Sequence, residues 1–252
     1  MPSKRVDVLG VQVDAVSEDD VLRVARECIQ SSASCHVVTV NAEFVMLARR
    51  SPGFAQALES ARLATPDGAA VVWAMRRHHA VQERRVGGAD LIVSISEQAA
   101  RDGSRVFLLG GARGVAAQAA RALRARYPDL QIAGTFAGSP SLEEEDAIVD
   151  LIRRSNADIL FVAFGAPQQE IWIARNLAQL GVSVALGVGG SFDYLAGTAR
   201  RAPMWMRDRG LEWLWRLMRQ PWRWRRMLVL PKFVWLVWRE PKPVTMKEEV
   251  RR

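Results

Sequence analysis

The sequence predicts an α/β fold: a Rossmann-like, mostly parallel sheet with helices on both faces, plus a basic, Trp-rich helical C-terminal appendage. Short apolar runs rich in Val, Ile and Leu alternate with amphipathic stretches of helical length, and three runs end in glycine-rich turns. Charge is uneven, because residues 200–252 carry a net charge of +10 and seven of the nine tryptophans, whereas residues 1–199 carry −2. The expected domains are therefore a Rossmann-like domain at 1–195 and an appendage at 196–252.

The bulk composition sets the class of protein. A chain of 252 residues that is 49% hydrophobic can bury one sizeable core, which excludes general disorder. Its two cysteines, Cys28 and Cys35, are too few for a disulfide scaffold or a metal cluster and suit a reducing cytoplasm. No signal peptide is visible, and no uncharged apolar run reaches the roughly 18 residues that span a bilayer.

The individual elements follow from apolar periodicity and from capping residues. Ser17, with Asp20 three residues later, predicts the start of a helix whose apolar residues recur at helical spacing. Strands are expected at 5–13, 35–41, 62–65, 105–109, 131–136, 158–164 and 182–188. Helices are expected between them at 42–50, 69–75, 88–100 and 143–154. One more helix follows the glycine-rich turn 110–114 and ends near 126, and another begins at 168. Strands alternating with helices of this length indicate a parallel sheet covered on both faces.

Polar residues gather where two of these strands end. Thr39 and Asn41 end the strand that starts at Cys35, and Asp67 lies in the turn Thr65-Pro66-Asp67-Gly68. Open parallel sheets bind ligands at this carboxyl edge. Asp67 could serve there as a general base, or it could cap the helix that follows, and the residues alone favour the cap.

Glycine-rich strand-to-helix junctions at 110–114, 165–167 and 187–190 are candidate phosphate-binding loops. Neither the dinucleotide fingerprint nor the P-loop spacing occurs, and each junction taken singly is also typical of a tight turn. Three junctions on one sheet edge favour a nucleotide-type ligand. The candidate binding residues at these junctions are Gly110, Gly111, Gly165, Gly189, Gly190 and Asp193.

Two further polar residues have competing interpretations. Gln169 either lies in a solvated first helical turn or points over the rim as a hydrogen-bond donor. Arg85 pairs either with a phosphate or with Glu83 or Asp90. No Asp-x-Asp pattern occurs, and His78 and His79 form an exposed pair with no third ligand nearby, so neither a metal nor a cofactor is expected. Positive charge for a departing diphosphate must then come from arginines or helix N-termini.

The appendage can supply such arginines. Arg209, Arg216, Arg219, Arg223 and Arg226 fall on one face of a helix that Pro221 kinks or restarts. The following apolar and aromatic run, 227–238, is broken by Pro231 and Lys232 and is too short to span a bilayer. Its composition suits a membrane interface, nucleic-acid binding or an oligomer interface, and the residues leave all three open.

Several motifs occur together in order. They are Thr39-x-Asn41, Thr65-Pro66-Asp67-Gly68, Arg85-Val86-Gly87-Gly88-Ala89-Asp90, Gly165-Ala166-Pro167-x-Gln169-Glu170, Gly187-Val188-Gly189-Gly190-Ser191-Phe192-Asp193, Arg201-Ala202-Pro203 and Leu211-Glu212-Trp213-Leu214-Trp215-Arg216-Leu217. This set, from about Val8 to Arg226, resembles the WecG/TagA/CpsF family of bacterial glycosyltransferases. Two departures are Gln168, where many relatives have Lys, and a longer, more Trp-rich tail past Arg226.

The resemblance implies an inverting, metal-independent transfer of a sugar from a UDP-sugar to a sugar on a lipid diphosphate, in polysaccharide or cell-wall polymer synthesis. It makes Asp67 the base, reversing the preference for a cap, and places Thr39, Asn41, Arg85 and Gln169 in the same pocket. It also implies that Arg216, Arg223 and Arg226 close the site while residues 200–252 dock on the anionic inner face of the cell membrane.

The resemblance leaves several points open. The donor sugar (N-acetylmannosamine, its uronic acid, glucose or glucuronate), the acceptor and a homo-oligomeric state are not fixed. The rival interpretation is a non-enzymatic nucleotide- or nucleic-acid-binding module with a basic tail. Asp67 and Gln169 argue against it, since a module that grips a phosphate backbone needs neither, and no nucleic-acid partner is expected.

Overall fold

The structure is a computed structural model that describes residues 5–78, 82, 84–221 and 224–240. A six-stranded sheet in the order β4-β3-β8-β7-β5-β6 forms its centre, and all neighbouring strands in it run parallel. The strands are β3 (Cys35–Val40), β4 (Leu63–Pro66), β5 (Arg105–Gly110), β6 (Gln131–Phe136), β7 (Ile159–Ala163) and β8 (Val184–Gly187). The predicted parallel α/β fold is confirmed.

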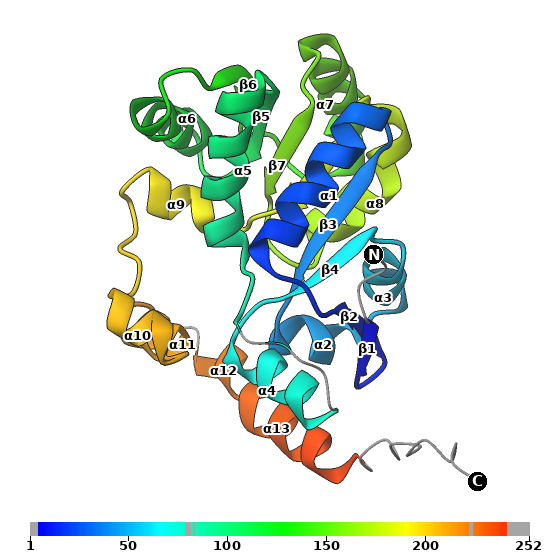
Figure 1. The fold of residues 1–252 in the computed structure, drawn as a ribbon, viewed down its shortest axis with the longest axis vertical. Coiled ribbons are helices and arrows are strands. Elements are labelled where there is room, and N and C mark those ends of the chain that lie inside the picture. The colour runs from blue at the N-terminus through cyan, green and yellow to red at the C-terminus, as the bar shows by residue number, and fades with distance from the viewer. Residues whose placement is uncertain (1–4, 79–81, 83, 222–223, 241–252) are drawn as a thin grey trace, which may run out of the picture.

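Alternate residues of each central strand enter different cores, because successive side chains of a strand point to opposite faces. On β5, Val106 and Leu108 pack with α1 (Glu18–Ser31), α5 (Gly88–Asp102) and α6 (Val115–Arg126). Phe107 and Leu109 pack on the other face with α7 (Leu142–Ser155) and α8 (Gln168–Leu180). In Figure 1, α1 and α5 lie on the near side of the sheet. The expected helical cover on both faces is thereby confirmed.

The β3–β4 side of the sheet is covered by α2 (Ala42–Ala48), α3 (Pro52–Glu59), α4 (Ala69–Arg77) and a hairpin of β1 (Arg5–Val8) and β2 (Val11–Asp14). The expected single strand at 5–13 is wrong. Leu9 and Gly10 adopt φ angles of 56° and 92°, and this left-handed turn reverses the chain into an antiparallel pair. The Ala64 N–H donates to Asp14 Oδ2 over 2.8 Å and ties the hairpin to β4.

Two local features of α1 bear on the expectations. Ser17 and Asp20 form the predicted capping box, each side chain accepting from the other's backbone N–H. At the far end of the helix, Cys28 and Cys35 form a disulfide that joins α1 to the start of β3. One bond is not a disulfide scaffold. The two cysteines were expected to suit a reducing cytoplasm, however, and this disulfide was not predicted.

The C-terminal part contains α9 (Ser191–Leu195), α10 (Met204–Asp208), α11 (Glu212–Arg219), α12 (Trp224–Met227) and α13 (Val229–Arg239). The single helix expected from Arg209 to Pro221 is wrong, because Gly210, with φ 71°, ends the turn after α10 and α11 starts only at Glu212. The expected interruption at Pro221 is confirmed, since Pro221 lies between α11 and α12. Pro231, which interrupts the apolar run in the sequence, does not interrupt helix α13. It lies in the first turn of α13, where a missing N–H removes no helical hydrogen bond.

Helix α13 is anchored to the body of the protein. Phe233 and Val237, four residues apart, are fully buried against residues of α2 and α4, and Figure 1 shows α13 beneath α4. Arg77 donates to the carbonyls of Val237 and Trp238 over 3.2 and 2.9 Å. His78 is not exposed as expected, since its Nε2 lies 3.3 Å from Glu240 Oε2, and His79 lies outside the described residues. Across the described residues, no helix is both long and apolar enough to cross a membrane.

Candidate active site

Asp67 lies at the carboxyl edge of the sheet, directly after β4. Its backbone N–H donates to the Val40 carbonyl at the end of β3 over 2.8 Å. The helix that follows, α4, has Gly68 as its N-cap, and no side chain caps it. The cap interpretation of Asp67 is therefore wrong. Its carboxylate instead faces Arg85, with 3.6 Å between Oδ1 and Nη1.

The segment before α5 holds Arg85 beside this edge. The Val86 N–H donates to the Pro66 carbonyl over 2.7 Å, and Thr65 Oγ1 donates to the Val86 carbonyl over 2.8 Å. A Cβ atom at Gly87 would collide with Asp67 Oδ1 and with the Arg85 guanidinium. Only glycine at position 87 leaves enough space for the Asp67 carboxylate and the Arg85 guanidinium to face each other.

Arg85 belongs to a group of charges that we call the carboxylate–arginine cluster, formed by Asp67, Arg85, Asp90, Arg201 and Glu212. Arg85 Nη2 lies 3.1 Å from Asp90 and 3.2 Å from Glu212. Arg201 lies 2.7 Å from Asp90 and 3.5 Å from Glu212. Of the partners considered for Arg85, Asp90 is confirmed, Glu83 lies outside the described residues, and a phosphate stays a prediction. The cluster joins the body to α11 of the appendage.

The cluster shifts the pKa values of two carboxyl groups in opposite directions. Burial raises the pKa of Asp67 to about 6; Arg85 and Arg216 oppose that shift, and the charges of Glu212 and Asp90 add to it. Burial also acts on Asp90, but its hydrogen bond to Arg201 and the charges of Arg201, Arg85 and Arg207 hold its pKa below the ordinary value. A carboxyl group with a pKa near 6 suits a general base, and the role of Asp67 stays a prediction.

Arg216 reaches the same edge from α11. Its Nε and Nη2 donate to the Tyr194 hydroxyl over 3.1 and 2.7 Å, and its guanidinium lies 5.6 Å from the centre of that ring. A Cβ atom at Gly190 would lie 3.5 Å from Arg216 Nη2. Arg216 thus lies beside the glycine loop after β8, and its role in binding stays a prediction. Arg223 and the side chain of Arg226 lie outside the described residues.

Gln169 fits neither of its two interpretations. Its side chain is buried, at 3% exposure, and is not in a solvated turn. Its Oε1 accepts from the N–H groups of Gly165 and Gly189 over 3.0 and 3.1 Å, and its Nε2 donates to Glu170 Oε1 over 2.8 Å. Gln169 therefore ties two glycine loops together instead of donating over the rim. These two glycine N–H groups point to Gln169, not to a phosphate.

Thr39 and Asn41 lie at the end of β3 but make different contacts. Thr39 is buried and in register with Thr65, and its Oγ1 would lie 3.5 Å from a Cβ atom at Gly88. Asn41 Oδ1 accepts from the Phe44 N–H over 3.0 Å and caps α2. Thr39 therefore lies beside the segment that carries Arg85, whereas the side chain of Asn41 is engaged in capping α2. Their binding roles stay predictions.

The remaining predicted binding residues have local structural contacts. Gly110, with φ 101°, leaves no room for a Cβ atom beside the Ala163 backbone, and the Gly111 N–H donates to the Ala163 carbonyl over 3.1 Å. Asp193 Oδ1 accepts from Thr198 Oγ1 over 3.3 Å. These residues shape the loops of the carboxyl edge, and their contact with a ligand stays a prediction.

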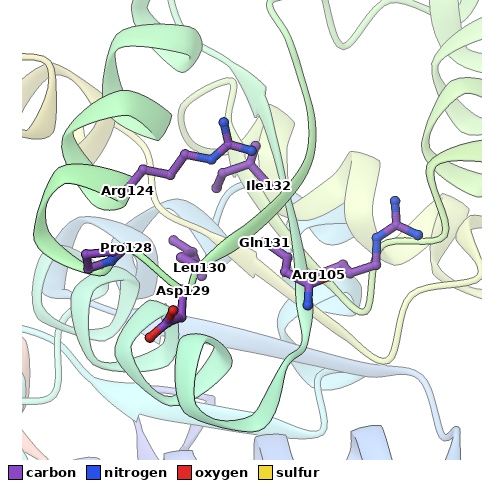
Figure 2. A pocket seen from close by; sticks show the side chains of 7 residues that line it. All are labelled: Arg105, Arg124, Pro128, Asp129, Leu130, Gln131 and Ile132. Atoms are coloured by element: carbon purple, nitrogen blue, oxygen red, sulfur yellow. The ribbon is translucent and has the colours of Figure 1, made fainter.

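Two open recesses of the surface lie away from Asp67 and Arg85. One of about 610 Å³ lies at the opposite, amino-terminal edge of the sheet, where Arg105 starts β5 and Gln131 starts β6. Figure 2 shows the side chains that line it. None of the predicted site residues is among them. Another, of about 630 Å³, is apolar and belongs to the appendage; it is lined by Trp213, Met227, Leu230, Pro231, Val234, Trp235 and Trp238.

The sequence indicated Asp90 only as a partner of Arg85 and gave no role to Glu212, Arg201, Tyr194 or the buried pair His36–Glu170. A signal existed for most of them, since Asp90, Glu170, Arg201 and Glu212 lie inside the quoted motifs. The described residues hold no group of three or more His, Cys, Asp or Glu side chains placed to bind a metal ion. Metal-independent chemistry stays a prediction.

Comparison with known proteins identifies the chain. Residues 6–246 match the Glycosyl transferase WecG/TagA/CpsF family. A Bacillus spizizenii (strain W23) protein named N-acetylglucosaminyldiphosphoundecaprenol N-acetyl-beta-D-mannosaminyltransferase is 33% identical over 93% of this chain and 90% of its own length. A protein of the same name from Bacillus subtilis (strain 168) is 34% identical over 82% of this chain and 80% of its own. The rival interpretation as a non-enzymatic module is therefore wrong, and the chain belongs to the WecG/TagA/CpsF family of glycosyltransferases.

Proposed function

We propose that this enzyme transfers N-acetylmannosamine from its UDP derivative to the N-acetylglucosamine of a lipid-diphosphate acceptor, with inversion and without a metal ion. The sugar and the acceptor are taken from the names of the two Bacillus relatives. The observation that carries the proposal is the Asp67 carboxylate, whose pKa is raised to about 6 at the carboxyl edge of a parallel sheet. At neutral pH such a group is largely ionised yet basic enough to accept a proton.

In the proposed reaction, an acceptor hydroxyl attacks the anomeric carbon of the donor from the face opposite to UDP. The new glycosidic C–O bond forms as the bond from that carbon to UDP breaks, and the hydroxyl proton passes to Asp67. The departing diphosphate gains negative charge, which Arg216 stabilises in this proposal. A single displacement inverts the anomeric configuration and needs one base and no covalent intermediate.

Asp67 keeps 27% of its side-chain surface exposed, which leaves an approach for the acceptor hydroxyl. Arg85 lies beyond hydrogen-bond distance at 3.6 Å and shares its charge with Asp90 and Glu212. The carboxylate is thus held in place without being neutralised by one tight ion pair. This arrangement supports a base that must bind and release a proton in each cycle.

The appendage is proposed to hold the enzyme against the inner face of the cell membrane. It carries the net charge of +10, and Trp205, Trp213, Trp224, Trp235 and Trp238 are among its exposed side chains. Basic and aromatic residues together favour the interface of an anionic bilayer. The apolar recess between α11 and α13 adds surface that suits lipid. Because α11 carries both Trp213 in this recess and Arg216 at the site, membrane contact and the active site share one helix.

The test is a transfer assay with purified enzyme, a panel of UDP-sugars and a short-chain lipid-diphosphate N-acetylglucosamine acceptor. The proposal expects transfer from UDP-N-acetylmannosamine, with release of UDP and a product of β configuration by NMR if the donor is the α anomer. Transfer from a different UDP-sugar would correct the donor. Retention of configuration, or no transfer from any UDP-sugar, would reject the proposed reaction.

A further inference from the structure

Two ionisable side chains that the proposed reaction does not use lie completely buried beneath the site. His36 of β3 and Glu170 of α8 are 1% and 0% exposed, and His36 Nε2 lies 2.8 Å from Glu170 Oε2. Burying such a pair costs free energy that apolar residues of similar size would not cost. Its place under the carboxyl edge calls for a role beyond packing.

The contacts of the pair favour one arrangement of its protons. His36 Nδ1 is buried and has no hydrogen-bond partner, so a doubly protonated ring would leave an N–H donor unsatisfied. The neutral ring with its proton on Nε2 donates to Glu170 Oε2 and leaves a bare acceptor at Nδ1. Glu170 is then an ionised carboxylate that accepts from His36 on one oxygen and from Gln169 on the other.

This carboxylate determines which way the Gln169 amide points. An ionised carboxylate only accepts, so the NH₂ group of Gln169 must face Glu170. The Gln169 carbonyl oxygen then faces the N–H groups of Gly165 and Gly189, which both donate to it. With the amide reversed, its NH₂ group would face two donors. Gly187 completes the arrangement, because a Cβ atom there would collide with both Glu170 and Gln169.

We infer that His36 and Glu170 are positioning residues. They hold the Gln169 amide in the orientation that ties the loop after β7 to the loop after β8, and so fix the loop on which Arg216 packs. Gly189 lies directly before Gly190, which Arg216 Nη2 approaches, and α9 with Tyr194 follows at once. The consequence for catalysis rests on the proposed function, because it acts through Arg216.

Substitution of His36 tests the inference and leaves the buried Glu170 side chain on α8 unchanged. In His36→Leu, Glu170 loses the donor on Oε2. In His36→Gln, an amide nitrogen reaches about the position of Nε2 and can still donate. We expect hydrogen exchange at the Gly165 and Gly189 amides to become at least about tenfold faster in His36→Leu, a factor that corresponds to 1.4 kcal/mol. His36→Gln should keep the wild-type rates.

Exchanging the two neighbours on α8 gives a second test. Glu170→Gln offers His36 and Gln169 one acceptor for two donors, so the amides of Gly165 and Gly189 should again exchange faster. The double variant Gln169→Glu/Glu170→Gln keeps one carboxylate and one amide and reverses only the hydrogen bond between positions 169 and 170. The two glycine N–H groups and His36 still meet oxygen acceptors, so the double variant should restore protection. Asn176→Ala is the matched control, since it removes a buried hydrogen bond to Trp172 on the same helix and should leave both glycine amides protected.

Kinetics then separate positioning from general stability. Glu170→Gln should lower kcat for transfer about tenfold in wild-type enzyme. Glu170→Gln should have little further effect in an Arg216→Gln background, because the loop after β8 then no longer positions an arginine. Wild-type exchange rates at Gly165 and Gly189 in both His36→Leu and Glu170→Gln would overturn the inference, as would equal losses of kcat in the two backgrounds. The exchange measurement needs no turnover, so it decides the positioning even if the proposed reaction fails.

Discussion

Asp67 and Arg85 face each other at the carboxyl edge of the sheet with 3.6 Å between Oδ1 and Nη1, and the same guanidinium lies 3.1 Å from Asp90. The nearer carboxyl, Asp90, has a pKa below its ordinary value, whereas burial raises that of Asp67 to about 6. One arginine therefore contacts two carboxylates of different basicity. The more basic one, Asp67, is the proposed proton acceptor, and Asp90 forms the shorter ion pair with Arg85.

Replacing Asp67 by Asn should lower transfer by about two orders of magnitude or more, the scale on which a general base contributes. Asn has nearly the same shape, so the loop before α4 should keep its conformation. Initial rates with saturating donor and acceptor measure the effect. Asp129→Asn, at the opposite edge of the sheet, is the matched control and should turn over like wild type. Near wild-type rates in a folded Asp67→Asn enzyme would show that Asp67 is not the general base.

The same substitution should stabilise the fold at neutral pH. The pKa of Asp67 is about 6 in the folded protein and near 3.8 when unfolded, so the folded state binds the proton more tightly. The resulting stability is present below about pH 4 and is lost as pH rises through 6, with an upper bound of about 3 kcal/mol. Asp67→Asn should therefore unfold at higher denaturant concentration than wild type at pH 7.5. The difference should vanish near pH 4, and a destabilised variant at pH 7.5 would contradict the raised pKa.

Arg216 should influence both the rate and its pH dependence. We expect kcat/KM of wild type to rise with pH through a limb near 6, because Asp67 must be ionised to accept the proton. The positive charge of Arg216 lowers the pKa of Asp67, so Arg216→Gln should move the limb to higher pH. It should also reduce kcat about 10²-fold if the guanidinium stabilises the leaving diphosphate.

Arg219→Gln supplies the control for this prediction. Arg219 is on the same helix but stacks on Trp215, with its guanidinium 5.1 Å from the ring centre. Its loss should leave the limb in place. Equal shifts of the limb in Arg216→Gln and Arg219→Gln would mean that net charge of the appendage, not the position of Arg216, sets the pH dependence.

Transfer should continue in excess EDTA. The sequence offers no Asp-x-Asp pattern, and the arginines of the site can carry the charge that a divalent cation would otherwise neutralise. Steady-state rates with EDTA, and again after addition of Mg²⁺ or Mn²⁺, measure this. An enzyme that stops in EDTA and recovers with either cation would require a metal ion in the reaction.

Membrane binding should depend on the exposed aromatic side chains of α13. Replacing Trp235 and Trp238 by Ser should weaken sedimentation with anionic liposomes at least about tenfold, or 1.4 kcal/mol. Turnover of a soluble acceptor should persist, since Arg216 and Asp67 are unchanged. Loss of turnover together with liposome binding would show that anchoring and catalysis are not separable in this way.

Because Phe233 and Val237 are buried in the core, membrane binding should be tested with point substitutions and not by deleting the appendage. Both residues lie in the core shared with α2 and α4, so removing everything after Ala196 would expose the apolar surface that they cover. Phe233→Ser should accordingly lower the denaturation midpoint, because it places a polar group in a fully buried site. Point substitutions on the exposed side of α13 avoid this loss.

The sequence by itself determined the fold class, the capped start of α1, the sheet edge that carries Asp67 and the family. These features depend on local patterns: alternation of apolar runs, capping residues, and motifs whose residues are close together in the chain. It also indicated that Arg85 could pair with Asp90, five residues away. The hairpin at the N-terminus was missed because Leu9-Gly10 reads as part of one apolar run, although its left-handed backbone reverses the chain.

Only the tertiary structure decided what the polar residues do. Asp67 stands where a helix cap is common, and its raised pKa, which suits the proposed base, comes from burial and from the charges of Glu212 and Asp90, against the opposing charges of Arg85 and Arg216. Gln169 could not be assigned from the chain, since its partners Gly189 and Glu170, and His36 behind them, meet through three different elements. Burial, the distance between charges and the direction of an amide depend on contacts between distant segments, and these exist only once the sheet and the appendage have packed together.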